Sequence, residues 1–94
     1  MRAAAIDVQK IEKDWKSRSF SFGVWTDAPR QVWENFVHET DELFLVLEAS
    51  VELEMQGKKF CPPVGKEVLI PAGVKHSVRN LGATTSRWLY GYES

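Results

Sequence analysis

Hydrophobic and polar residues alternate along much of this chain with the period of two that is typical of β-strands. In residues 51–56, valine, leucine and methionine alternate with glutamate and glutamine. This pattern predicts a half-buried strand with one face toward a core and the other toward water. Residues 88–92 alternate in the same way, which places Trp88, Tyr90 and Tyr92 on one face of a second strand.

Short segments rich in Val, Leu, Phe and Trp follow one another from residue 20 onward, and turn-forming residues separate them. The separators are Asp27-Ala28-Pro29, Glu39-Thr40-Asp41, Gln56-Gly57-Lys58, Pro62-Pro63 and Ala72-Gly73. We therefore predict an all-β fold with a core barrel over about residues 20–92. Residues 1–18 differ, because Val8, Ile11 and Trp15 have helical spacing; this segment is either a short helix or an extended arm lying on the barrel.

Residues 43–47, Leu-Phe-Leu-Val-Leu, are apolar on both faces of the strand that they predict. Such a strand needs cover on two sides, from a second sheet or from another subunit, so a homodimer is one expectation. The same run is the longest uninterrupted apolar stretch and is far shorter than the ~20 residues that span a bilayer. We therefore expect no membrane segment.

The composition is that of one small globular domain: 94 residues, of which 44% are hydrophobic. Lys and Arg number 12 against 13 Asp and Glu, so the chain lacks the basic excess that nucleic acid or anionic lipid would favour. The single cysteine, Cys61, cannot form an internal disulfide, and no apolar stretch of signal-peptide length precedes Asp7. A cytoplasmic location is the expectation.

Two histidines and a glutamate are candidates for a metal site. A hairpin closed by Glu39-Thr40-Asp41 would place His38 and Glu42 opposite each other on antiparallel strands, with Cβ atoms roughly 4.5–5.5 Å apart. His76 follows a turn at Pro71-Ala72-Gly73, where proline fixes φ and glycine accepts a positive φ, so the next strand would begin with an inward histidine. For His76 alone, a core histidine bonded to a carbonyl is the preferred interpretation; beside His38 and Glu42 we favour metal binding.

Two imidazoles and one carboxylate form the ligand set of non-haem Fe(II) oxygenases, and the same set binds Zn²⁺. Mn and Ni stay open as well, because ligand type alone does not select among these ions. The residues therefore predict a divalent transition metal of unassigned identity.

Residues 65–80 carry a spaced signature, and the run 73–80, Gly-Val-Lys-His-Ser-Val-Arg-Asn, is specific in type and order. The signature consists of Gly65, Pro71, Gly73, His76 and Asn80. It resembles the second motif of the cupin superfamily in full.

The first cupin motif is present in part. His38 and Glu42 stand at two of its ligand positions, whereas Phe36 stands where the motif has its first histidine. Arg30 and Ala49 occupy positions at which glycine is usual. The exchange at Phe36 removes one neutral ligand and puts an apolar ring beside the expected metal, so we expect lower metal affinity.

The resemblance spans about residues 20–92 and is to small single-domain conserved-barrel cupins of the cupin 2 type. It implies a jelly-roll barrel of two antiparallel sheets around a ligand cavity, commonly dimeric, that binds Fe, Mn, Ni or Zn. It implies no single activity, because the superfamily includes dioxygenases, isomerases, sugar-binding modules and storage proteins. In this family the asparagine matched by Asn80 is usually structural.

Five residues are expected to line the cavity: Phe36, Phe44, Val78, Trp88 and Tyr90. Trp25 and Trp33 are further aromatic candidates, although most aromatic residues in so short a chain pack in a core. Glu34 shares the period-two face with Phe36 and His38, yet it lies about 13 Å from His38 along a strand, so it is expected behind the ligands or at the barrel mouth instead. Arg79 and Arg87 are expected to be solvated or paired with glutamate, not to anchor a ligand.

These observations favour a small metal-binding cupin, and a metal-dependent enzyme of dioxygenase or isomerase type is the leading interpretation. A non-catalytic small-molecule binding or sensing module with weak or no metal is the alternative, and the loss of one histidine favours it. A purely structural dimerising barrel is a third interpretation.

Overall fold

The computed structural model describes residues 6–94, which form one helix and eight strands. The helix is α1 (Val8–Ser17). The strands are β1 (Gly23–Asp27), β2 (Val32–Phe36), β3 (Glu42–Glu48), β4 (Glu52–Met55), β5 (Lys58–Phe60), β6 (Glu67–Ile70), β7 (His76–Arg79) and β8 (Ser86–Tyr92). The first five residues of the expected N-terminal arm lie outside the described part of the chain.

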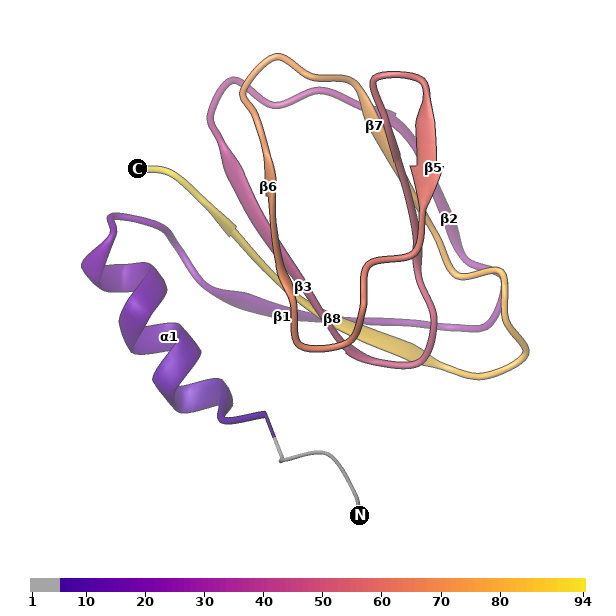
Figure 1. The fold of residues 1–94 in the computed structure, drawn as a ribbon, viewed down its shortest axis with the longest axis horizontal. Helices are drawn as coiled ribbons and strands as arrows, with labels where there is room; N and C mark the ends of the chain where they lie inside the picture. Colours follow the sequence, from indigo (N-terminus) through magenta and orange to yellow (C-terminus); the bar gives the residue numbers. More distant parts are fainter. Residues whose placement is uncertain (1–5) are drawn as a thin grey trace.

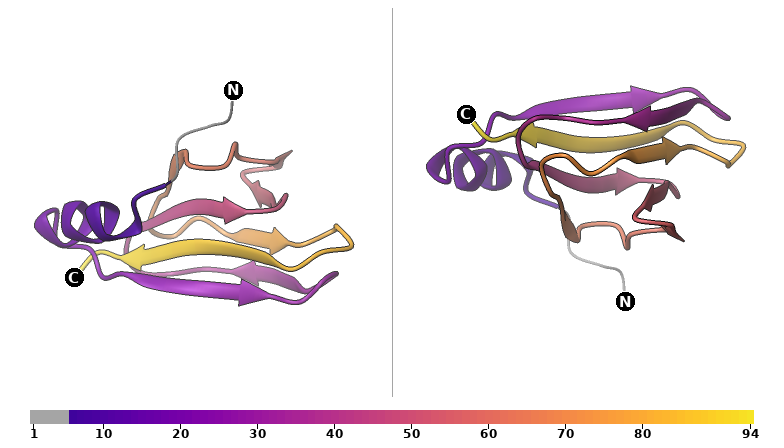
Figure 2. Two further views of the ribbon diagram at one scale, coloured as in Figure 1. Left: turned by 90° about the horizontal axis from the view of Figure 1, so that it is seen from below. Right: turned by 90° about the horizontal axis from the view of Figure 1, so that it is seen from above.

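The strands form two four-stranded antiparallel sheets, with the orders β1-β8-β3-β6 and β2-β7-β4-β5. The two sheets face each other across the interior, and α1 lies outside them on the side of the first sheet (Figure 1). Views from below and above show the helix beside one end of the strands (Figure 2). The predicted all-β fold of two antiparallel sheets is confirmed.

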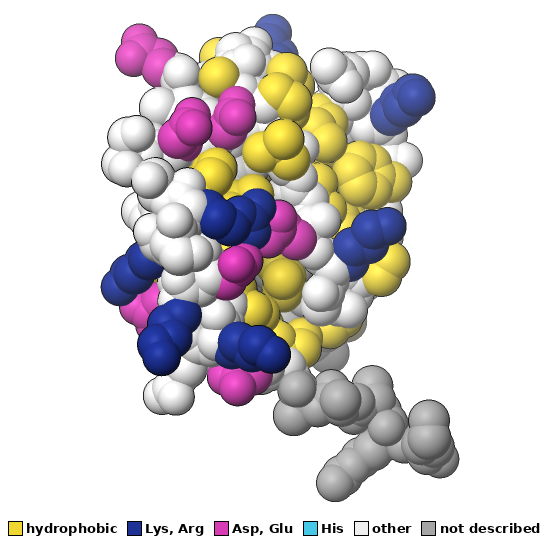
Figure 3. Space-filling model, turned by 60° about the vertical axis from the view of Figure 1, so that its left-hand side comes forward, with side chains coloured by type: hydrophobic (Ala, Val, Ile, Leu, Met, Phe, Trp, Pro, Cys, Tyr) yellow, Lys and Arg dark blue, Asp and Glu magenta, His cyan; other side chains and the backbone are white. Residues whose placement is uncertain are grey.

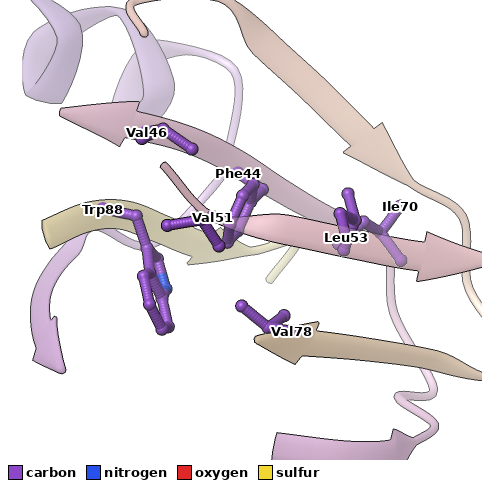
Figure 4. Packing of buried hydrophobic residues seen from close by; sticks show 7 residues of the cluster. All are labelled: Phe44, Val46, Val51, Leu53, Ile70, Val78 and Trp88. Atoms are coloured by element: carbon purple, nitrogen blue, oxygen red, sulfur yellow. The ribbon is translucent and has the colours of Figure 1, made fainter. Parts of the chain in front are cut away.

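The main core lies between the sheets, because each sheet turns its apolar face inward. Its buried side chains come from both sheets and point toward one another (Figure 4). They are Phe44, Val46, Val51, Leu53, Ile70, Val78 and Trp88. The predicted alternation in residues 51–56 is confirmed, since Val51 and Leu53 are fully buried while Glu52 and Glu54 reach an arginine on the outer face.

The outer face of β3 is covered by the chain's own helix. Asp7 caps α1 by accepting a hydrogen bond from the Lys10 amide at 3.1 Å. The helical spacing noted in the sequence then turns Trp15 onto a second cluster with Leu43 and Leu45. The cover expected from a second sheet or another subunit thus comes from a second sheet on one face of β3 and from α1 on the other. Because β3 is covered on both faces within one chain, it does not need a second subunit, and a homodimer stays a prediction.

The connection between β2 and β3 differs from the expected hairpin. The two strands belong to different sheets: β2 pairs with β7, whereas β3 pairs with β6 and β8. Residues 37–41 therefore cross from one sheet to the other at one end of the barrel. Two bonds tie this crossing to the loop before β7: the Gly73 amide donates to the His38 carbonyl at 2.9 Å, and the Ala72 amide donates to Asp41 Oδ1 at 2.7 Å.

Charged side chains of both signs are interspersed with hydrophobic ones on the face shown in Figure 3. This distribution agrees with the near-balance of 12 basic and 13 acidic residues in the whole chain. In the part of the chain that the structure describes, no helix has the length and apolar character needed to cross a membrane.

Candidate metal centre and cavity

Three candidate ligands meet at the end of the barrel where the sheets are joined by the 37–41 crossing. Glu42 is the first residue of β3 and His76 is the first residue of β7, so the two come from opposite sheets. His38 lies in the crossing itself. The structure thus brings together the three residues that the sequence singled out, although a crossing between sheets and not a hairpin positions His38 beside Glu42.

The ligand atoms of this triad face one another. Glu42 Oε1 lies 3.4 Å from His76 Nε2 and 3.5 Å from His38 Nε2. One candidate ligand atom from each of the three residues lies within 4.8 Å of the others, and no second such group exists among residues 6–94. Ligand atoms that share one ion at about 2.0–2.2 Å lie roughly 3–3.5 Å apart, so these spacings are compatible with a shared cation.

Glu42 carries the most informative atom of the site. Its side chain is 8% exposed, and its Oε1 atom is buried without a hydrogen-bond partner among the described residues. The two histidine nitrogens are farther away than the ~2.7–2.9 Å of a charge-assisted hydrogen bond. A buried carboxylate oxygen without a donor is costly, and a metal ion would satisfy it, so the residues present fit a cation.

His76 is oriented by its backbone neighbour. Its Nδ1 atom lies 3.0 Å from the Val74 carbonyl oxygen, which can only accept, so Nδ1 donates there, and Nε2, which faces Glu42, is the nitrogen left to bind a metal. Metal-binding histidines commonly have such a partner behind the ring. Burial lowers the pKa of His76, but the Glu42 carboxylate and the Val74 carbonyl outweigh it, so the pKa is raised above its ordinary 6.5.

A cavity of about 310 Å³ opens beside the triad and extends between the sheets. Its walls are almost entirely aromatic or aliphatic apart from the triad. They are formed by Trp25, Trp33, Phe36, His38, Glu42, Phe44, His76, Val78, Trp88, Tyr90 and Tyr92. The five residues expected to line a cavity all lie in this wall.

Tyr92 belongs to the site although it was not among the expected wall residues. It pairs with Glu42 in the sheet, and its ring packs edge-on against His38 with centroids 4.9 Å apart. Burial, followed by the charge of Glu42 and the neighbouring Tyr90, raises the pKa of Tyr92 to about 12. The shared face of residues 88–92 was the sequence signal that could have included it.

Phe36 and Glu34 do not share a face, contrary to the expectation. Strand β2 contains an irregularity between Trp33 and Phe36, where Asn35 has a positive φ of 58°. This irregularity turns both aromatic side chains into the cavity and leaves Glu34 on the outer face, bonded to Arg79. The Phe36 ring centroid lies 6.2 Å from that of His38 and 6.5 Å from that of His76, beside the triad.

The remaining motif residues lie away from the cavity. Arg79 donates to three glutamates on the outer face of its sheet, at 2.6–3.0 Å, which raises the pKa of its guanidinium. Asn80 is fully buried and ties two loops together, donating to the Ala28 and Thr84 carbonyls. Arg87 lies 3.9 Å from a glutamate on the surface. These contacts are structural.

Comparisons with known proteins agree with the observed fold of two antiparallel sheets. The cupin domain family matches residues 23–92, which is most of the chain. No curated protein matches the sequence significantly.

Solved structures with the same fold include a cupin 2 conserved barrel domain protein from Salinispora arenicola, with a TM-score of 0.72 and 20% identity over 81% of this chain and 64% of that one. The cupin 2 domain of an XRE family transcriptional regulator from Enterobacter cloacae has a TM-score of 0.73 and 18% identity over 85% of this chain and 87% of that one. DMSP lyase DddQ from Ruegeria pomeroyi has a TM-score of 0.72 and 19% identity over 81% of this chain and 39% of the lyase. This chain thus spans less than two thirds of the Salinispora protein and of the lyase. The family match over residues 23–92 shows that the chain belongs to the cupin domain family.

Proposed function

We propose that this cupin domain binds a divalent transition metal through His38, Glu42 and His76 and uses it to bind a small molecule in the adjoining cavity. The observation that carries the proposal is the buried Glu42 oxygen, which has no hydrogen-bond donor and lies 3.4 and 3.5 Å from the two histidine nitrogens. The ligand set accommodates Fe, Mn, Ni or Zn.

The chain's own residues would shape the reaction around that ion. Three protein ligands leave coordination positions free, and a bound ion would supply Lewis-acid polarisation or dioxygen activation. Phe36 and Phe44 would exclude water from the cavity, because their rings form its wall near the triad. The Tyr92 phenol, with an ordinary pKa of about 10, keeps its proton at neutral pH and can donate a hydrogen bond to a ligand atom.

A metal-dependent enzyme of dioxygenase or isomerase type is the activity that we favour. The alternative is a non-catalytic binding or sensing module, supported by Phe36 at the place of one histidine. The structural likeness to a cupin domain of a transcriptional regulator is compatible with that alternative, and the likeness to a lyase is compatible with an enzyme. Because the regulator domain and the lyase are only 18% and 19% identical to this chain, these likenesses show a shared fold only.

Metal titration into chelator-treated protein tests the site. We expect one equivalent of metal to bind the wild type, and His38→Ala and His76→Ala each to weaken binding at least about tenfold. Glu48→Gln is the matched control, because Glu48 lies at the other end of β3 and is exposed. Equal metal affinity in wild type and both histidine variants would refute the site.

Incubation with a small-molecule mixture separates the enzyme from the binding module. With the metal-loaded protein at low concentration, loss of one compound in large excess over protein would establish turnover. Recovery of a compound unchanged, at no more than one equivalent per chain, would establish the binding module. The His76→Ala variant supplies the control, because compounds lost without the metal site do not report on it.

A further inference from the structure

The cavity has two chemically different ends. The strand register shows this: Tyr92 pairs with Glu42 beside the triad, whereas Trp88, four residues along β8, pairs with Val46 and with Trp25 of β1. Four strand residues span roughly 13 Å. Away from the triad, the wall is therefore built from aromatic rings.

The Trp25 ring stands nearly perpendicular to two other rings of this wall. Trp25 meets Trp33 edge-to-face, with centroids 5.6 Å apart and planes at 78°. Trp25 also meets Tyr90 at 6.3 Å and 77°. We call Trp25, Trp33 and Tyr90 the aromatic box. Rings set at right angles present π-faces in different directions, and each face carries partial negative charge.

A buried carboxylate lies behind the box. Asp27 is 2% exposed, and its Oδ1 atom accepts from Trp25 Nε1 at 2.6 Å and from Trp33 Nε1 at 3.1 Å; Oδ2 accepts from Trp33 Nε1 at 3.0 Å. Within residues 6–94 no Lys, Arg or His lies within salt-bridge distance of this carboxylate. An indole that donates to a carboxylate gains electron density in its ring, so Asp27 fixes both rings and makes their faces more attractive to a cation.

The lining of the cavity contains no Lys and no Arg. An anionic group at the box end would therefore have no cationic partner and would lie near Asp27. A primary ammonium would also be poorly served, because it needs hydrogen-bond acceptors, and the Asp27 carboxylate is 2% exposed and is not part of the cavity lining. A quaternary ammonium has no hydrogen to donate and is recognised through ring faces.

We propose that the aromatic box binds a quaternary ammonium group of the small ligand that occupies this cavity. The inference deepens the proposed function, since it assigns a ligand class to the cavity beside the triad. Trp25 is 39% exposed, so the box is reachable from solvent.

Calorimetric titration with choline and with its neutral carbon analogue 3,3-dimethylbutan-1-ol tests the box. The two probes have the same shape and the same hydroxyl group, so a contact between that hydroxyl and a metal would contribute equally to both affinities. The difference between the two affinities therefore reports the effect of the positive charge. We expect choline to bind at least about tenfold more tightly. Equal binding, tighter binding of the neutral alcohol, or no binding of choline would overturn the proposal and leave an apolar pocket.

Substitutions in β1 test whether choline binds at the aromatic box. Trp25→Leu should lower choline affinity at least about tenfold, whereas Trp25→Phe, which keeps a ring but loses the N–H donated to Asp27, should lower it less. Val24→Ala, on the outward face of the same strand, should change nothing. In NMR spectra choline should shift the indole signals of Trp25 and Trp33 but not that of Trp15, which donates to Glu67 outside the cavity. Shifts spread equally over all tryptophans would contradict the assignment.

Asp27→Asn tests the charge behind the rings and should reduce the preference for choline over the alcohol severalfold; an unchanged preference would remove Asp27 from the account. If Asp27→Asn does not fold, because it changes a buried carboxylate, the comparison of Trp25→Leu with Trp25→Phe decides whether the box binds choline. The same titration on His76→Ala separates the two proposals. If His76→Ala loses the metal but still binds choline more tightly than the neutral alcohol, the box is supported independently of the metal site. If the wild type binds metal but shows no preference for choline, the box alone is refuted.

Discussion

Glu42 shows how one side chain can define a site. A carboxylate that is nearly excluded from water normally collects hydrogen bonds, yet its Oε1 atom has none among the described residues and faces two histidine nitrogens. His76 is held from behind by the Val74 carbonyl, so its free nitrogen is already aimed. The carbonyl bond alone would also suit a core histidine, the alternative that the sequence left open. The Glu42 oxygen without a donor is the feature that favours the proposed metal site.

Phe36 offers a gain-of-function test at the same site. Its ring stands beside both histidines and lines the cavity, so Phe36→His should add a fourth ligand and tighten metal binding by at least about tenfold. Competition with a chelating dye measures the change. Phe60→His is the matched control, because Phe60 is similarly exposed but lies on β5. If both variants bind metal equally well, position 36 does not face the ion.

Gly91 is a position where a single methyl group should be costly. A Cβ there would overlap the Ser21 carbonyl oxygen and would lie 3.0 Å from the Trp15 ring. Gly91→Ala should therefore lower the free energy of unfolding by about 1–3 kcal/mol or more, measured by urea denaturation. Gly82→Ala, whose Cβ would meet nothing closer than 3.5 Å, should have a small effect. Equal losses in the two variants would contradict this packing.

The docking of α1 depends on a small polar cluster at its end. Glu67 on β6 accepts from Trp15 Nε1 at 3.0 Å and from both terminal nitrogens of Arg18 at 2.9–3.0 Å. Trp15 is fully buried beneath this contact, so one carboxylate joins the helix to the first sheet. Arg18 chiefly, and Trp15 in addition, lower the pKa of Glu67 below its ordinary 4.5 despite partial burial.

A lowered pKa gives this contact a defined pH dependence. Its contribution to stability is present above pH about 4.5 and is lost as the pH falls through the lower pKa of the folded state. The difference in Tm between wild type and Glu67→Gln should therefore be largest at neutral pH and shrink below pH 4. High salt should reduce it, because the pair is partly exposed. A difference independent of pH would mean that packing, not charge, holds the helix.

Local patterns were sufficient to predict some elements. Alternation in residues 51–56 predicted β4, and the Gln56-Gly57 turn has the two positive φ values, 54° and 75°, of a tight hairpin. The sheet to which each strand belongs could not be predicted in this way, because pairing such as β2 with β7 joins residues far apart in sequence. That is why His38 was expected in a hairpin, and why Glu34 was placed on the wrong face of an irregular strand.

At the scale of the whole molecule, both candidate binding regions lie in the cavity between the two sheets. One end of the cavity carries the three candidate ligands, and the other carries rings fixed by Asp27. The three candidate ligands were predicted from residue types and motif spacing. The three rings of the box were cavity candidates in the sequence, but their link through Asp27 was not predicted, because Trp33 lies in the opposite sheet from Trp25 and Asp27. The spacing of two between Trp25 and Asp27 on one strand face was a usable signal.

Elemental analysis by inductively coupled plasma mass spectrometry, on protein purified without chelator, is the most direct test of this account. We expect close to one transition metal ion per chain in wild type and in Glu48→Gln, and almost none in Glu42→Gln, because only Glu42 supplies the buried oxygen of the site. Absence of metal from wild type, even after incubation with Fe, Mn, Ni and Zn, or full metal content in Glu42→Gln, would contradict it.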